Sequence, residues 1–346
     1  MGNHIIDRER LVRRMLGAVL LALPLLLPVS AHAQGPRPPV IIFDTDMDYD
    51  DVAALAYLAE EHRLGRIDLR AVTVVNNGGG LPGRAIRNAR CVVERLGLHG
   101  VRVADGSNSA PNTFPEEILQ TVDRVVTSVT PGCDATETPS RVRAPQLIRR
   151  VLKEEPGARI VVTGPLSNVA AALPEAAGRI TSMGGAIGVP GNLCCGTPPE
   201  FDGTQEFNYW IDPAASQTVI RHNPQPVHLM PLNATDDVPI TQEFLDRLRA
   251  DHHTPAADIV FKAYTHPDIE PLISAGLLFW WDPLAAMTTV HPEIVKSTTG
   301  RVDVVTDGPA AGRTFLSPKG RSMTYGVAAD RATFEERFLN TLNGRR

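Results

Sequence analysis

The sequence predicts an α/β fold, a single large domain with a central, mainly parallel sheet flanked by helices. Short apolar runs of strand length alternate with longer amphipathic segments of helical character over most of the chain. This alternation is typical of βαβ units. Neither an internal repeat nor a linker-like stretch interrupts it after the N-terminal segment, so residues 34–346 are predicted to form one large domain.

The first half of the domain gives the clearest sequence of elements. Predicted strands cover residues 40–43, 69–75, 101–104, 159–163 and 180–184. Helices are predicted at 51–62, at 84–96 and at 167–173, and a further helix ends at Lys153. The later third predicts a helix at 212–220, a strand at 227–230, helices at 242–251 and 256–264, and another helix after Asp282. Ligands of such sheets bind at the carboxyl ends of the strands, so functional residues are expected there.

Residues 1–33 are predicted to be a cleaved secretory signal peptide. A basic start leads into the apolar run Met15 to Val29, which is followed by Ala31-His32-Ala33. This run is shorter than the roughly 20 residues that cross a bilayer as a helix, so we expect no membrane association after cleavage. The mature protein is expected to be exported, either periplasmic or secreted, with the Sec and twin-arginine routes both open.

Charge and cysteine content narrow the classes of partner. The net charge of −5 offers no basic patch, which excludes a nucleic acid polymer and leaves a small molecule. The four cysteines are Cys91, Cys133, Cys194 and Cys195, and their spacing matches no zinc pattern. In an oxidising compartment one or two disulfides are expected, with Cys194 or Cys195 bonded to Cys133. Free buried thiols are the alternative.

The most informative segment carries five aspartates within residues 44–51, directly after the first predicted strand. Like charges this close repel, and a divalent cation converts the repulsion into attraction. Ligation by oxygen alone favours calcium or magnesium over zinc. The spacing does not fit the calcium loop of an EF-hand. A solvated helix N-cap would explain Asp50 or Asp51 but not Asp44 and Asp46.

Residues 44–51 resemble the N-terminal aspartate signature of the inosine–uridine-preferring nucleoside hydrolase family. Four further stretches resemble the family in the same order: Val74–Asn77, Val162–Asn168, Glu206–Asn208 with Ile211–Pro213, and Trp281–Ala285. Together they span almost the whole mature chain. The resemblance implies an enzyme that cuts the N-glycosidic bond of ribonucleosides with water, in a role such as nucleoside salvage. It also implies a homo-oligomer, a dimer or a tetramer.

The resemblance also implies roles for individual residues. The calcium ligands would be Asp46, Asp51, Asp282 and the main-chain carbonyl of Thr163. Asp46 would also be the catalytic base that takes a proton from the calcium-bound water. The ribose would be held by Asp50, Asn77, Asn192, Glu206 and Asn208, whose acceptors and amides suit a sugar triol. Turns and caps are the alternative role for the asparagines, Thr163 and Glu206.

The chain departs from the usual family pattern at two places. Met47-Asp48 replaces Pro-Gly, so that Asp48 either faces the sugar or is a solvated acid. Trp281 stands where many members have a proton-donating histidine, which resembles the purine-specific branch and predicts a purine preference through stacking on the base. If Trp280 and Trp281 lie on a strand, at most one faces the site, and both being core residues is the alternative.

Several further interpretations stay open. The second ring against the base would be Phe114 or Tyr264, and residues 107–145 form either a lid or a surface excursion pinned by Cys133. The catalytic candidates of lower weight are His252, His253 and His266. A haloacid-dehalogenase-type phosphatase is a competing class, although Asp48 departs from its motif. A non-enzymatic exported calcium- or sugar-binding protein of the same fold is another.

Overall fold

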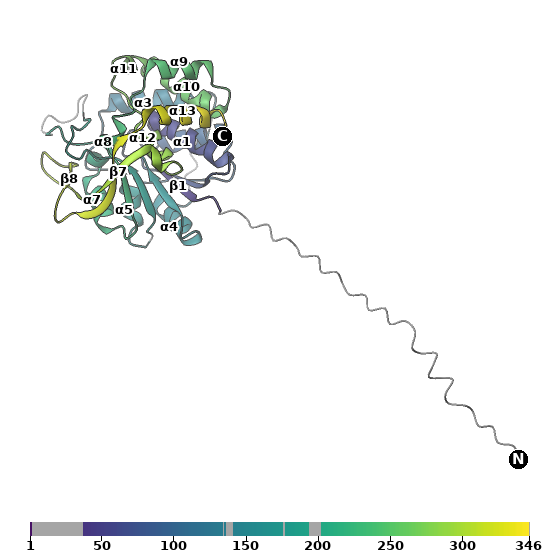
Figure 1. Ribbon diagram of the computed structural model, residues 1–346, viewed down its shortest axis with the longest axis horizontal. Coiled ribbons are helices and arrows are strands. Elements are labelled where there is room, and N and C mark those ends of the chain that lie inside the picture. Colours follow the sequence, from purple (N-terminus) through teal and green to yellow (C-terminus); the bar gives the residue numbers. More distant parts are fainter. Residues whose placement is uncertain (2–36, 134, 136–140, 176, 194–201, 346) are drawn as a thin grey trace. The chain divides into compact units, whose positions relative to one another are not determined.

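Nine strands form one sheet in the computed structural model, which describes residues 1, 37–133, 135, 141–175, 177–193 and 202–345 (Figure 1). In spatial order they are β3 (Arg102–Asp105), β2 (Asp68–Val74), β1 (Val40–Thr45), β4 (Arg159–Val162), β5 (Arg179–Met183), β6 (Val227–Met230), β9 (Arg321–Ala329), β7 (Val295–Val304) and β8 (Thr314–Leu316). All neighbouring pairs from β3 to β9 run parallel, whereas β7 is antiparallel to β9 and to β8. The predicted α/β class with a mainly parallel sheet is confirmed.

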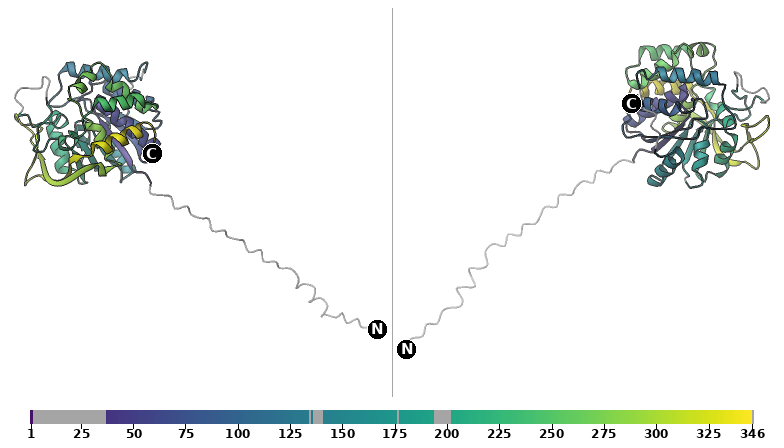
Figure 2. Two further views of the ribbon diagram at one scale, coloured as in Figure 1. Left: turned by 45° about the horizontal axis from the view of Figure 1, so that its top comes forward. Right: turned by 180° about the vertical axis from the view of Figure 1, so that it is seen from behind.

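Helices cover both faces of the sheet, and Figure 1 shows α9, α10 and α11 (Glu270–Ser274) on one side with α4, α5 and α7 on the other. The first layer contains α1 (Tyr49–Arg63), α2 (Ala85–Arg95), α3 (Glu116–Ser128), α9 (Gln242–Ala250), α10 (Pro255–Tyr264), α12 (Trp281–Met287) and α13 (Arg331–Leu342). The second contains α4 (Ala144–Glu154), α5 (Ser167–Ala172) and α7 (Pro213–His222). Figure 2 shows the same layers from two further directions. Both layers belong to one compact unit, Pro38–Arg346.

The central strand β1 explains why the apolar runs predicted strands correctly. Ile41 and Phe43 pack into the core of the first helical layer, and Ile42 packs into that of the second. A strand buried on both faces needs a continuous apolar sequence rather than an alternating one. The same strand lies between β2 and β4, so the carboxyl end of β1 is enclosed on both sides.

The order of the strands predicts a ligand-binding crevice at that end of β1. After β1 the chain builds β2 and β3 on one side, then returns to place β4 on the other side. This reversal of strand order is a topological switch point, where helices on opposite faces leave room for a ligand at the carboxyl edge. The predicted functional segments after β1, β2 and β4 and at the start of α12 therefore meet in the expected region.

Some elements were not predicted from the sequence. The three missed strands are β7, β8 and β9, the missed helices include α3, α13 and the short α6 (Phe207–Ile211), and Trp280-Trp281 lead into α12 rather than lying on a strand. Strand β7 has a long exposed stretch at residues 296–299, so it lacks the alternation that marks a strand in the sequence. No helix in the described part of the chain is long and apolar enough to cross a membrane.

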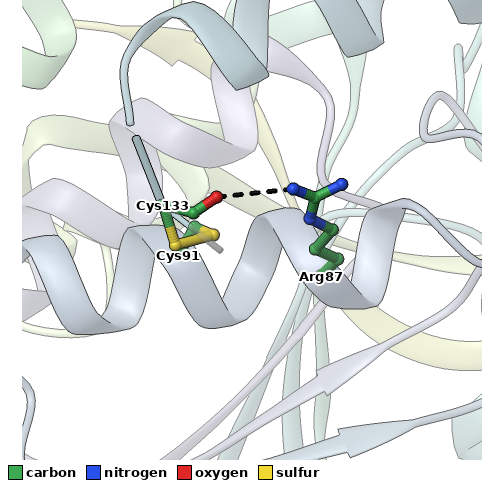
Figure 3. Close-up of a disulfide and its surroundings, with 3 residues drawn as sticks. All are labelled: Arg87, Cys91 and Cys133. Carbon is green, nitrogen blue, oxygen red and sulfur yellow. Dashed lines mark hydrogen bonds between the residues drawn. A yellow bond between two sulfur atoms is a disulfide. The ribbon is translucent and has the colours of Figure 1, made fainter. Parts of the chain in front are cut away.

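The predicted disulfide was wrong, because Cys133 bonds to Cys91 instead (Figure 3). The bond joins α2 to the turn after α3, with the two Cα atoms 5.8 Å apart. Arg87 on α2 donates to the Cys133 carbonyl at 3.4 Å. Asp123 on α3 accepts hydrogen bonds from Arg84 and Asn88 on α2, which brings that turn against α2. Cys194 and Cys195 lie outside the described residues.

Candidate functional site

The turn after β1 directs the acidic side chains into the crevice. Asp44 and Asp46 are buried at the end of the strand, and Met47 follows with a φ of 61°. A non-glycine residue in the left-handed region costs of order 1 kcal/mol, and such residues cluster at functional sites. The Met47 side chain is fully buried and its amide donates to the Thr45 hydroxyl at 3.0 Å. The surrounding core therefore holds the turn in this conformation.

Asp48 is the N-cap of α1, which neither interpretation from the sequence anticipated. Its carboxylate accepts a hydrogen bond from the Tyr49 amide at 2.5 Å, and its own amide donates to Asp51 at 2.8 Å. The Asp51 amide in turn donates to the Asp48 side chain, which completes a capping box. Asp48 therefore sets where α1 begins, and it thereby orients Asp50 and Asp51 in the first turn.

Three carboxylates from two distant parts of the chain converge beside this turn. One oxygen each from Asp50, Asp51 and Asp282 lies within 4.8 Å of the others, and all three residues are buried. Asp46 lies against the same group, because its carboxylate is within hydrogen-bonding reach of that of Asp51. The structure thus brings together the three aspartates that were predicted as metal ligands, and it adds Asp50.

The electrostatics of this cluster favour a bound cation. Burial raises the pKa of Asp50 to about 7, and burial with repulsion from neighbouring aspartates raises the pKa of Asp51 and Asp282 well above the ordinary value. Within the described ranges, no ion pair joins these carboxylates to lysine, arginine or histidine. A buried set of oxygen donors without a counter-ion fits a hard divalent ion such as calcium.

Thr163 contacts the cluster from the end of β4. Its amide donates to the Asp44 carbonyl at 2.9 Å, and its hydroxyl donates to an Asp51 carboxylate oxygen at 2.5 Å. The Thr163 carbonyl, the predicted ligand, accepts from the Asn208 side-chain amide at 3.2 Å. The hydroxyl contact was not predicted from the sequence, and it fixes the Asp51 side chain in the crevice.

Asp44 lies beneath the cluster and has its own partners. Its Oδ1 accepts from the Thr73 hydroxyl at 2.5 Å and from the Asn168 amide at 2.9 Å, while Oδ2 has no hydrogen-bond partner among the described residues. Burial raises the pKa of Asp44 to about 7. Asn168 also accepts from the Ser107 amide, at 3.1 Å. Sequence analysis missed Thr73, whose only signal is its register opposite Asp44 on β2.

Asn77 carries an unsatisfied acceptor into the site. Its amide nitrogen donates to the Ser109 carbonyl at 2.8 Å and to the Ser167 hydroxyl at 3.0 Å. Its Oδ1 is buried with no partner in the described ranges. Because buried polar atoms are nearly always paired, an unpaired oxygen beside an acidic crevice is suited to accept a hydrogen bond from a ligand hydroxyl.

Glu206 is a buried N-cap rather than a solvated residue. Its carboxylate accepts from the backbone amides of Asn208 at 3.0 Å, Gly185 at 2.9 Å and Tyr209 at 3.2 Å. Burial raises its pKa to about 7, with a smaller contribution from the charge of Asp46. Asn192 lies beside this stretch, since its Oδ1 accepts from the Phe207 amide at 3.2 Å.

The two adjacent tryptophans have different environments. Trp280 is fully buried, with its ring 4.6 Å from Tyr264 and 4.9 Å from Phe338. Trp281 is partly exposed at the start of α12, one residue before Asp282, with its ring 5.7 Å from Phe279. Of the two rings only that of Trp281 is partly exposed, and because the pair leads into α12, the limit expected for two neighbours on a strand does not apply.

The remaining aromatic and histidine candidates differ in burial and in the residues that they contact. Tyr264 is fully buried in the core, whereas Phe114 is partly exposed and lies 4.5 Å from Phe207, beside Glu206. The described contacts of the three histidines lie elsewhere. His252 stacks on Phe261, the His253 side chain is exposed, and His266 accepts from the Asp268 amide.

Residues 107–145 contain two parts with different surroundings. The first part contacts the site, because Ser107 and Ser109 bind Asn77 and the Asn112 side chain donates to the Trp210 carbonyl at 2.6 Å. The second part, α3 with Cys133, packs on α2. The prediction of a surface segment held in place by Cys133 therefore applies to the later part. The earlier part lies beside Asn77 and the Trp210 carbonyl.

Comparisons with known proteins agree with this geometry. The family model described as inosine-uridine preferring nucleoside hydrolase matches residues 41–336. "Probable uridine nucleosidase 2" of Oryza sativa subsp. japonica is 27% identical over 299 residues, which cover 83% of this chain and 84% of the relative.

Two solved structures share the fold. The inosine-uridine preferring nucleoside hydrolase of Bacillus anthracis has a TM-score of 0.76 at 24% identity, over 88% of this chain and 99% of that chain. The purine-preferring ribonucleoside hydrolase of Gardnerella vaginalis has a TM-score of 0.68 at 24% identity, over 88% of this chain and 98% of that chain. The resemblance noted in the sequence is thereby confirmed, and the family match displaces the phosphatase alternative. The chain belongs to the inosine-uridine preferring nucleoside hydrolase family.

Proposed function

We propose that the chain hydrolyses the N-glycosidic bond of ribonucleosides to free base and ribose, with calcium as its cofactor and a preference for purine nucleosides. The observation that carries the proposal is the convergence of Asp46, Asp50, Asp51 and Asp282 in a buried crevice. Such a cluster is self-repelling without a cation, and it lies at the edge of the sheet where ligands bind.

Asp46 acts as the general base in this proposal. Asp51, Asp282 and Asp46 would hold the calcium together with the Thr163 carbonyl, which also accepts from the Asn208 amide. The bound cation lowers the pKa of water. The Asp46 carboxylate then accepts the water proton, a step that contributes about 100- to 10,000-fold to a rate when the base is well positioned.

The sugar is held by the polar groups around the cluster. The unpaired Asn77 Oδ1 accepts from a ribose hydroxyl, and Asp50 accepts from a second one. Asn208 and Asn192, which lie beside Glu206 and Phe207, also bind the ribose. The buried carboxylate of Glu206, which three backbone amides hold in place, stabilises positive charge that develops on the ring in an oxocarbenium-like transition state.

The purine preference rests on Trp281. It is the partly exposed ring immediately before Asp282, and it cannot donate a proton to a leaving base as an imidazolium would. Cleavage then depends on a base that is gripped by stacking and protonated from solvent. Purines present a basic N7 and a wide aromatic face, and uracil presents neither to the same degree.

A nucleoside panel tests the activity. The purified chain should release reducing sugar from inosine, adenosine and guanosine in calcium buffer, more slowly from uridine, and not after treatment with a chelator. Equal or faster cleavage of uridine, the substrate in the name of the rice relative, would contradict the purine preference. No sugar release from any nucleoside would leave the alternative of a non-enzymatic binding protein.

Substitution of the stacking ring tests the preference directly. Trp281→Ala should lose about 1–3 kcal/mol of transition-state stabilisation on purine nucleosides, roughly 5- to 150-fold in kcat/KM. The loss should be smaller on a nucleoside analogue with a nitrophenol leaving group, which needs no help to depart. An unchanged purine rate would show that Trp281 does not contact the base.

The proposal also includes export and assembly. The signal peptide at residues 1–33 would direct the chain to the periplasm or the medium, and the Cys91–Cys133 disulfide suits such an oxidising compartment. N-terminal sequencing of the exported protein should begin near Gln34. Sedimentation should give a dimer or a tetramer, and a monomer would contradict that part of the proposal.

A further inference from the structure

Three consecutive glycines, Gly78 to Gly80, follow Asn77 at the end of β2. None of them has its φ in the left-handed region that favours glycine. Their backbone conformations are therefore open to other residues, and a turn requirement does not explain them. The explanation has to come from the space around each α-carbon.

At Gly78 and Gly80 that space is occupied by Asp46, and at Gly79 it is occupied by the Asp48 side chain. A Cβ atom at Gly78 would lie 1.8 Å from Asp46 Oδ2 and 2.6 Å from its Cγ. At Gly80 it would lie 2.2 Å from the Asp46 carbonyl oxygen. On another side of the same residue, a Cβ at Gly164 would lie 3.0 Å from the Asp46 Cβ and amide nitrogen. The backbone thus approaches Asp46 more closely than any side chain permits.

One of the glycines also binds the carboxylate. The Gly79 amide donates to Asp46 Oδ2 at 2.7 Å, within a buried site. A hydrogen bond from an amide to an ionised carboxylate is about twice as strong as one between neutral groups. This bond therefore fixes the rotation of the carboxylate, and it leaves Oδ1 as the oxygen without a backbone donor from this loop.

We propose that Gly78–Gly80 form a backbone cradle that positions Asp46, with the Gly79 amide holding Oδ2 so that Oδ1 is presented to the attacking water. This inference rests on the proposed role of Asp46 as general base. The glycines are positioning residues, since they act through Asp46. Positioning matters at this scale because a misplacement of about 1 Å can cost on the order of 100-fold in rate.

The variant Gly78→Ala tests the cradle, with Gly157→Ala as its matched control. The new methyl group at residue 78 takes the place of Asp46 Oδ2, whereas at residue 157 nothing lies within 4 Å and φ is unstrained. On inosine with calcium, Gly78→Ala should lower kcat by about 100-fold with a smaller change in KM. Gly157→Ala should keep parental kinetics. Parental kcat in Gly78→Ala would overturn the proposal.

A double-mutant cycle separates positioning from a general structural role. In an Asp46→Asn background, Gly78→Ala should cost little further activity, because the base on which it acts is already absent. Losses that multiply fully would overturn the proposal, since they would mean that Gly78 acts independently of Asp46.

A double-mutant cycle measured by thermal unfolding tests the same contact without any assay of activity. In chelator, Gly78→Ala should lower Tm, and the decrease should largely disappear in an Asp46→Gly background, where the colliding carboxyl group and the Asp46 Cβ are both gone. An equal decrease in both backgrounds would overturn the cradle. Because this measurement needs no substrate and no metal, it decides the inference even if the nucleoside panel shows no hydrolysis.

Discussion

The two ends of helix α1 place a fully buried carboxylate in opposite surroundings. Near the C-terminus, Glu61 receives hydrogen bonds from the guanidinium of Arg66, one of them at 2.8 Å, and from the Thr341 hydroxyl at 3.2 Å. In the first turn, Asp51 faces Asp46, Asp50 and Asp282, and its pKa is raised well above the ordinary value by burial and by the charges of Asp46 and Asp50. Both residues have 0% exposure.

This difference shows which charges the fold balances by itself. At Glu61 the chain supplies the cation, so the pair stabilises the structure without any ligand. At Asp51 the chain supplies more carboxylates, and the helix dipole offsets only about 0.3–1 kcal/mol of their cost. The imbalance at the N-terminal end of α1 is therefore the property of a binding site, whereas the balanced pair at the other end is structural.

The largest expected effect separates the two ends by activity. Asp46→Asn should keep the fold and lower turnover about 100- to 10,000-fold or more, because a base positioned for proton removal is lost. Glu61→Gln, at the balanced end, should leave turnover near the parental value. Steady-state kinetics on inosine with calcium measure both. Near-parental turnover in Asp46→Asn would show that another group is the base.

The second effect separates the two ends by cation-dependent stability. At a calcium concentration about 100 times Kd, the free energy of unfolding of the parent should rise by about 2.7 kcal/mol. Asp51→Asn should lose this increase. Glu61→Gln should cost about 2 kcal/mol by itself and retain the full increase with calcium. Chemical denaturation with and without calcium measures these values, and a calcium response that survives in Asp51→Asn would contradict the ligand set.

A smaller effect appears in the pH dependence of the metal-free chain. The pKa values of Asp44 and Glu206 are raised to about 7 from ordinary values near 4, so between pH 4 and pH 7 the folded chain holds protons that the unfolded chain has released. Stability should therefore fall as pH rises through that window, by roughly 1 kcal/mol per pH unit for each of the two groups.

Denaturation in chelator at pH 5 and pH 7 measures this slope. Glu206→Gln should flatten it, because the residue no longer titrates, while Glu61→Gln should leave it unchanged. A stability that rises from pH 5 to pH 7 in the metal-free parent would mean that the buried carboxylates have partners that hold them ionised.

Much of the site followed from local patterns in the sequence. Asp44, Asp46 and Asp51 drew attention because acidic residues after an apolar strand have few structural roles, and Asp282 because it lies among apolar residues. Their convergence follows from the parallel sheet, which brings the carboxyl ends of strands to one edge. The sequence did not indicate which of Trp280 and Trp281 is exposed, because the burial of each ring depends on tertiary packing.

What the sequence determined by itself is the α/β class, the positions of the main buried strands and the acidic character of the site, because each depends on residues that are neighbours along the chain. Tertiary structure alone decided the pairing of Cys133 with Cys91, the partners Thr73 and Asn168 of Asp44, and the closeness of Gly78 to Asp46. These contacts join residues far apart in the sequence. They depend on how α3 packs on α2 and on the register of β2 against β1, and no local pattern encodes either distance.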